Sequence, residues 1–152
     1  MCSPSSTSSV AGYLMGANRI DPVSFALHAR DEAFDIFGNW VLNTAQASSL
    51  LGSSWRCWVE RLGGFGDIYS RLKRNLPVVV SLKGALPGAR FPYPNGHLIV
   101  VKGYDPRKER VLCMDPAFSD DAATVVDYHL PDFMDAWSKR RFLAYLFEPR
   151  RP

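Results

Sequence analysis

The apolar residues of this chain follow two different periods along the sequence. In the first third they recur three or four residues apart, as on one face of a helix, and later they alternate every second residue, as on a strand. The pattern predicts helices over about residues 2–17, 21–34, 38–52, 66–75 and 132–137. It predicts strands over about residues 55–59, 77–82, 97–101, 111–115, 124–128 and 142–147. Helices first and an antiparallel sheet later indicate an α+β domain.

Turn and cap residues support several of these boundaries. Pro4 stands in the first turn of the first predicted helix, where its missing N–H costs nothing. Asp21 before Pro22 is a second helix start. A Pro- and Gly-rich loop over residues 84–96 precedes one strand, and a polar turn over residues 105–109 joins that strand to the next. The two strands therefore form a hairpin.

His97 and Asp115 lie at equal distances from the centre of this hairpin. Each is nine residues from Pro106, so a hairpin without a bulge sets them directly opposite each other. Opposed residues project to the same face of the sheet, with Cβ atoms roughly 5 Å apart. A carboxylate in that position fixes the tautomer of the histidine and stabilises its imidazolium form.

Cys2 opens the first predicted helix. The free N–H groups and partial positive charge of a helix N-terminus favour thiolate over thiol. Thiolate is the nucleophilic form, so this position suits covalent catalysis. Spacing alone does not bring Cys2 to His97.

The amino-acid composition narrows the class of protein to which the chain can belong. The chain has 152 residues, of which 47% are hydrophobic and 22% charged, as in one folded domain over residues 1–152. Its formal net charge is +3, and the basic cluster at residues 139–141 suits a solvated helix end better than a nucleic-acid interface. No apolar run approaches the roughly 20 residues that span a bilayer, and no basic-then-apolar signal peptide is present. The sequence leaves oligomeric state and location open.

The three cysteines, Cys2, Cys57 and Cys113, give neither a disulfide framework nor a close zinc pair. We interpret Cys57 and Cys113 as small buried hydrophobic residues. Cys113 shares the strand face of Asp115, so an alternative interpretation is that it lines the site around His97 and Asp115. A zinc site of Cys2, His97 and Cys113 is disfavoured because no close ligand pair nucleates it. We expect no metal and no cofactor.

Five segments in order resemble one family. They are Cys2-Ser3-Pro4-Ser5-Ser6, Gly38-Asn39-Trp40 with Asn43-Thr44-Ala45, Leu76-Pro77-Val78-Val79-Val80-Ser81, Gly96-His97-Leu98-Ile99-Val100-Val101-Lys102-Gly103-Tyr104 and Met114-Asp115-Pro116-Ala117, with a weaker match at residues 133–137. The chain resembles the bacterial cysteine peptidases related to the bacteriocin-processing, double-glycine-leader peptidases, the peptidase C thirty-nine-like branch of the papain-like superfamily.

The resemblance implies a papain-like fold, with N-terminal helices packed on a C-terminal antiparallel sheet. It implies a Cys-His-Asp triad at Cys2, His97 and Asp115 that hydrolyses a peptide or related amide through an acyl-enzyme. Two alternatives use the same fold: a catalytically silent peptide-binding module, and an amidase or transpeptidase acting on another amide.

The family pattern begins before its cysteine, with a strand and a glutamine that helps to bind the oxyanion. Only Met1 precedes Cys2 here, and Gln46 is not at the matching position. We therefore expect that residues 1–152 lack an upstream segment. If that segment is missing, the resemblance to the family would allow the protein to be exported. Two motifs each have two possible interpretations. Gly38-Asn39-Trp40 either lines the substrate cleft or fixes the start of a helix. Phe91 and Tyr93, in the loop before His97, either shape the cleft or only pack against the protein.

Overall fold

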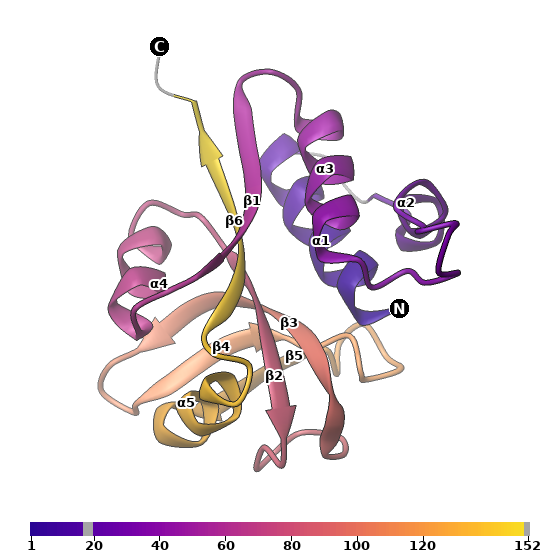
Figure 1. Ribbon diagram of the computed structural model, residues 1–152. Helices are drawn as coiled ribbons and strands as arrows, with labels where there is room; N and C mark the ends of the chain where they lie inside the picture. Colours follow the sequence, from indigo (N-terminus) through magenta and orange to yellow (C-terminus); the bar gives the residue numbers. More distant parts are fainter. Residues whose placement is uncertain (17–19, 151–152) are drawn as a thin grey trace.

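The computed structural model describes residues 1–16 and 20–150 (Figure 1). Its helices are α1 (Cys2–Met15), α2 (Pro22–His28), α3 (Trp40–Leu51), α4 (Phe65–Leu72) and α5 (Leu130–Ser138). Its strands are β1 (Trp55–Arg61), β2 (Val78–Gly84), β3 (Tyr93–Asp105), β4 (Arg110–Met114), β5 (Val125–His129) and β6 (Leu143–Pro149). Ala17, expected in the first helix, lies outside the described residues.

The strands form one antiparallel sheet in the order β1-β6-β2-β3-β4-β5. The last strand of the chain therefore lies inside the sheet, between the first and second strands (Figure 1). This mixed architecture is the α+β fold that the hydrophobic pattern predicts.

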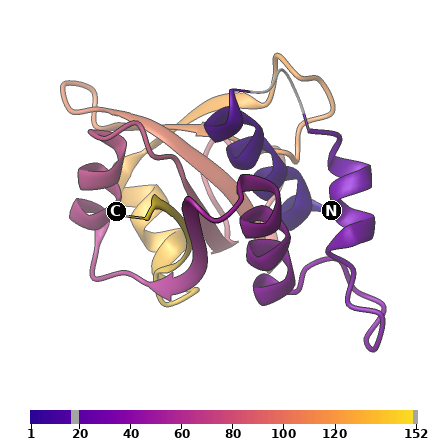
Figure 2. The same ribbon diagram turned by 90° about the horizontal axis from the view of Figure 1, so that it is seen from above.

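Helices cover both faces of the sheet. Alternation along β2 turns Val79 toward α1, α2 and α3, while Val78 and Val80 face α4 and α5. Figures 1 and 2 show α1 to α3 grouped together, apart from α4 and α5. The sequence predicted the first group packed on the sheet, and the second group adds a further layer.

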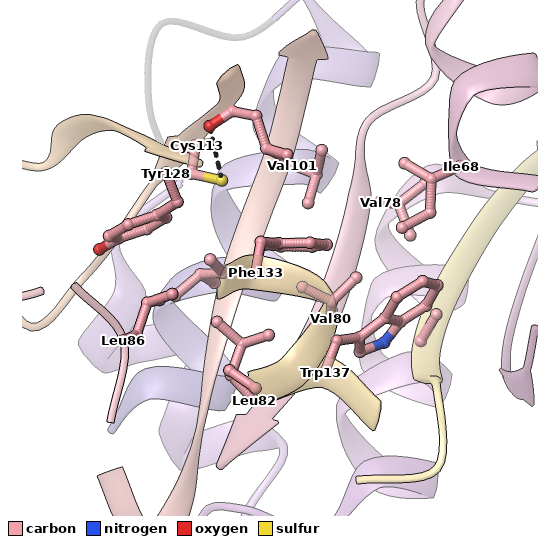
Figure 3. Close-up of a cluster of buried hydrophobic side chains, with 14 of the residues drawn as sticks. Ile68, Val78, Val80, Leu82, Leu86, Val101, Cys113, Tyr128, Phe133 and Trp137 are labelled. Atoms are coloured by element: carbon pink, nitrogen blue, oxygen red, sulfur yellow. Dashed lines mark hydrogen bonds between the residues drawn. The ribbon is translucent and has the colours of Figure 1, made fainter. Parts of the chain in front are cut away.

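The core beneath α4 and α5 is the larger of two apolar clusters. Figure 3 shows Trp137 and Phe133 of α5 against Val80 and Leu82 of β2. The indole Nε1 of Trp137 donates a hydrogen bond of 2.9 Å to the carbonyl oxygen of Leu143, which satisfies its one polar atom. This cluster supports the sheet from the side opposite α1.

Several boundaries differ from the prediction, among them the end of β3 at Asp105 and the end of α4 at Leu72. The helix expected to reach residue 34 ends at His28, because the chain turns back and Asp31 forms an isolated β-bridge with Ile36. Asp35 adopts a left-handed φ of 52° in that turn and pairs with Arg30. The loop expected up to residue 96 ends earlier, since β3 already pairs at Tyr93.

The predicted direct opposition of His97 and Asp115 is wrong. The pair Asp105↔Arg110 centres the turn between Arg107 and Lys108 instead of on Pro106. An extra residue, Lys102, also bulges from β3 between the pairs Val101↔Cys113 and Gly103↔Leu112 and shifts the register by one. Pairing ends at Val100↔Met114, which puts Asp115 two residues out of step with His97. An offset of two keeps both side chains on one face, because strand side chains alternate with period two.

Candidate active site

Cys2 occupies the first helical position of α1, after Met1 as the N-cap residue. No side chain among the described residues caps this end. The N–H of Ser5 donates to the carbonyl oxygen of Met1 at 3.1 Å, and Pro4 has no N–H. The N–H groups of Cys2 and Ser3 are thus the helix-end donors left beside the thiol.

Buried hydroxyl groups dock α1 onto the sheet. The hydroxyls of Ser3 and Tyr145 lie 2.9 Å apart, and Ser6 Oγ donates to the carbonyl oxygen of Leu98 at 2.9 Å. Both serines are fully buried. These two contacts join the first turns of α1 to β6 and β3, so the position of Cys2 is set from two strands.

His97 lies where β3 departs from its regular pairing with β2. Leu82↔His97 is followed by Gly84↔Tyr93, so four residue steps on β3 match two on β2. The extra length brings Tyr93 back over the imidazole, with ring centroids 4.1 Å apart in a stacked arrangement. His97 is only 7% exposed, and its ring plane is therefore fixed by packing.

Asp115 is fully buried and accepts four hydrogen bonds. Its Oδ1 accepts from His97 Nε2 at 2.6 Å and from the Ala117 N–H at 2.9 Å. Its Oδ2 accepts from the hydroxyls of Tyr93 and Tyr128, both at 2.7 Å. Burial alone raises the pKa of Asp115, but the bonds from His97, Tyr128 and Ala117 outweigh it, and the pKa is lowered. The carboxylate is therefore held ionised and immobile.

The thiol of Cys2 and the imidazole of His97 shift each other's protonation. Burial raises the pKa of Cys2, but a hydrogen bond with His97, the histidine charge and the backbone N–H of Leu98 outweigh it, so the pKa is lowered. Burial lowers the pKa of His97, but hydrogen bonds with Asp115 and Cys2 raise it to about 9. Both shifts favour a thiolate–imidazolium pair, the reactive form of a cysteine nucleophile.

The structure thus brings Cys2, His97 and Asp115 together in one chain of contacts. Since Nε2 of His97 faces Asp115, its other ring nitrogen, Nδ1, is the one available to the thiol. Cys113 is not part of the site, because it is fully buried in the cluster beneath α5 (Figure 3). Cys57 lies half-buried on β1, where burial raises its pKa to about 11. Among the described residues, no group of His, Cys, Asp and Glu side chains suits a metal ion.

A cavity of about 700 Å³ flanks the site along α1. Its walls include Ser5 and Gly12 of the helix and Pro116, which follows Asp115. Its lining does not include Cys2 or His97. Asp115 is likewise absent from the lining, although its neighbours Met114 and Pro116 belong to it.

The sequence model of the Peptidase C39-like family matches residues 1–145. The chain belongs to the Peptidase C39-like family. A crystal structure from Bacillus anthracis, described as that of a C39-like peptidase, superimposes with a TM-score of 0.72 and 17% sequence identity, covering 99% of this chain and 90% of that chain. The search of curated proteins gave no match.

Membership of this family makes the chain a cysteine-type peptidase by class. The expected papain-like mixture of helices and antiparallel sheet agrees with the Bacillus anthracis structure, which at this identity supports the fold alone. Within the described part of the chain, no helix is both long and apolar enough to cross a membrane.

Sequence reasoning missed several residues around the site of this C39-like peptidase. Ser3 and Ser6 are three residues apart, so the sequence places them on the same face of the helix. This spacing is the one feature of the sequence that indicates their shared contact with the sheet. Tyr128 and Tyr145 come from distant strands, and nothing in their sequence context connects them with His97. Of the two loop aromatics, Tyr93 belongs to the site, whereas Phe91 packs edge-on against it and is 51% exposed.

Proposed function

We propose that this protein hydrolyses a peptide or related amide bond through an acyl-enzyme, with Cys2 as nucleophile, His97 as general acid and base, and Asp115 as the residue that positions His97. One observation carries the proposal: the imidazole lies between a thiol of lowered pKa and a buried carboxylate whose oxygen is 2.6 Å from Nε2.

The first half of the reaction transfers the acyl group to sulfur. The Cys2 thiolate attacks the carbonyl carbon, and negative charge moves to the carbonyl oxygen. The uncapped N–H groups of Cys2 and Ser3 point along the axis of α1 at its N-terminus and offer donors to that oxygen. The His97 imidazolium then gives its proton to the leaving amine as the C–N bond breaks.

The second half returns the enzyme to its starting state. His97, now neutral, takes a proton from water as the water oxygen attacks the thioester carbon. The C–S bond breaks, the carboxylic acid leaves, and the thiolate–imidazolium pair is restored. Asp115 stays ionised throughout and holds Nε2 protonated, so that Nδ1 exchanges the proton with sulfur and substrate.

Thiol labelling tests the nucleophile without knowledge of the substrate. With limiting iodoacetamide at pH 7, mass spectrometry of the digested protein should find Cys2 alkylated far ahead of Cys57 and Cys113, whose pKa values are raised by burial. His97→Ala should slow the labelling of Cys2 and leave the other two unchanged. Equal labelling of all three cysteines in the folded protein would reject the proposal.

Hydrolysis is tested with a library of short peptides, followed by mass spectrometry, with Cys2→Ala as the matched inactive control. Cleavage by the wild type that Cys2→Ala abolishes supports the peptidase. Fast labelling of Cys2 with peptide binding and no cleavage would instead identify a peptide-binding module. Transfer of the acyl group to an added amine in preference to water would identify a transpeptidase.

A further inference from the structure

Arg140 lies on the turn between α5 and β6, and its half-buried guanidinium lies among Ser81, Trp40 and Gly96. Its Nε donates to Ser81 Oγ at 3.1 Å, and its Cζ lies 5.8 Å from the centroid of the Trp40 ring. A Cβ on Gly96 would lie 3.3 Å from Cζ and from Nε. Gly96 directly precedes His97, so the guanidinium lies against the backbone next to the proposed base.

The same surroundings connect Arg140 with Cys2. Ser81 pairs with Leu98, whose N–H stabilises the Cys2 thiolate. The charge of Arg140 also acts on the hydroxyl of Tyr145, which bonds to Ser3 beside Cys2. Trp40 begins α3, whereas Ser81 and Gly96 belong to the sheet, so Arg140 lies between the helical and the sheet parts of the site.

The charge of Arg140 is not neutralised by any residue that the structure describes. Its neighbour Lys139 pairs with Asp135, and Arg110 pairs with Asp127, but no described carboxylate forms an ion pair with Arg140. Of its three guanidinium nitrogens, only Nε has a hydrogen-bond partner among residues 1–16 and 20–150. The half-buried guanidinium therefore keeps two terminal nitrogens for a ligand, in the planar geometry that suits a carboxylate.

The backbone that carries Arg140 is held in an unfavourable conformation. The next two residues, Arg141 and Phe142, have left-handed φ angles of 54° and 57° although neither is glycine. Arg61 stabilises this turn, because its Nη1 donates to the carbonyl oxygens of Arg140 and Arg141 at 2.8 and 3.2 Å. Such strain is concentrated at functional sites, where it fixes a side chain in place.

We propose that Arg140 is a specificity residue that binds a carboxylate of the substrate close to the scissile bond. The inference rests on the peptidase function proposed above and adds the substrate class: peptides with an acidic side chain, or a free C-terminal carboxylate, within reach of Arg140. The guanidinium of Arg140 lies against Gly96, the residue before His97, and forms no ion pair with a carboxylate that the structure describes.

The first test needs no turnover, so it separates this inference from the peptidase proposal. Second-order rates of Cys2 alkylation are measured with anionic iodoacetate and neutral iodoacetamide for the wild type, Arg140→Gln, Arg140→Lys and the exposed neighbour variant Arg141→Gln. The iodoacetate-to-iodoacetamide ratio should fall severalfold in Arg140→Gln, and it should be preserved in Arg140→Lys and Arg141→Gln. An unchanged ratio in folded Arg140→Gln, with Cys2 still reacting fast, overturns the inference alone. Slow alkylation of wild-type Cys2 overturns the peptidase proposal.

The second test identifies the source of the carboxylate. Matched peptides carry Glu or Gln at each position around the cleaved bond, each with a free or an amidated C-terminus. For the preferred carboxylate, the ratio of kcat/KM values for acidic and neutral peptides should fall about tenfold in Arg140→Gln and less in Arg140→Lys. A preference for Glu over Gln indicates a side-chain carboxylate, and a preference for free over amidated ends indicates the C-terminus. Equal losses for acidic and neutral peptides would show a purely structural Arg140 and overturn the inference.

Discussion

The ring of Tyr93 stacks on the imidazole of His97 at an interplanar angle of 22°, and the hydroxyl of the same tyrosine donates to Asp115. One side chain therefore contacts both the plane of the imidazole and the carboxylate that is hydrogen-bonded to it. Its two contributions are separable, because Phe keeps the ring and removes only the hydroxyl.

Replacing Tyr93 by Phe should therefore be milder than replacing it by Ala. Tyr93→Phe removes one hydrogen bond to a buried carboxylate, which costs roughly 1.5–3 kcal/mol in the free energy of unfolding. Tyr93→Ala also removes the stacked ring and should lower kcat further, because His97 is then free to rotate. Urea unfolding and steady-state kinetics measure the two effects. Equal kcat values in the two folded variants would show that the stacking does not position His97.

Asp115→Asn should reduce activity less than His97→Ala. An asparagine oxygen can still accept from His97 Nε2 and the Ala117 N–H, and its amide hydrogens can face the oxygens of Tyr93 and Tyr128. We expect a loss of about tenfold, since a charged acceptor becomes a neutral one. His97→Ala removes the acid and base, a loss on the order of 10²- to 10⁴-fold. Single-turnover rates decide, and the opposite ranking would contradict the assigned roles.

Activity should follow a bell-shaped pH profile. The pKa of Cys2 is lowered, so the thiolate forms below the range of an ordinary thiol, and activity rises with pH through that lowered value. The pKa of His97 is raised to about 9, so the imidazolium is present below about pH 9 and is lost as the pH rises through it. The basic limb of kcat/KM should therefore fall near pH 9. A basic limb near pH 6.5, the value of an isolated histidine, would contradict the thiolate–imidazolium pair.

Ser6→Ala should displace Cys2 indirectly, by removing a contact that holds α1 against β3. The substitution leaves the buried carbonyl oxygen of Leu98 without the Ser6 hydroxyl, at a cost of about 1–3 kcal/mol in unfolding free energy. Because Leu98 also stabilises the Cys2 thiolate, the iodoacetamide rate of Cys2 should fall as well. Ser9→Ala is the matched control: Ser9 is exposed and bonds only to Ser5 within α1. Equal effects of the two substitutions on the labelling rate would argue against docking through Ser6.

The sequence predicted most elements of the fold because their apolar periods are strong. The strands around Val78 and Ile99 are buried β-branched runs, and the helix capped by Asn39 ends close to the expected glycine, Gly52. The helix expected to reach residue 34 was overestimated because its apolar spacing continues through Phe34, which in the structure is 76% exposed in a turn.

The approach of His97 to Asp115 was predicted for a reason that needed correction. The equal spacing from Pro106 assumed a regular hairpin centred there. The pair Asp105↔Arg110 instead centres the turn between Arg107 and Lys108, and the one-residue bulge at Lys102 then leaves His97 and Asp115 two residues out of register. The prediction of one shared face survived because the shift is even, and the side chains bridge the diagonal. The approach of Cys2 and Arg140 depends on packing between distant segments, which local spacing does not encode.

The position of β6 inside the sheet has a consequence for the growing chain. Ser3, beside Cys2, is synthesised well before Tyr145, to which it bonds across a separation of 142 residues. The sheet cannot be completed before β6, the last of its strands along the chain, has been made, and contacts of such sequence separation form late in folding. The thiol of Cys2 therefore has the pKa of an ordinary cysteine until β6 has joined the sheet, and the lowered pKa belongs to the folded domain alone.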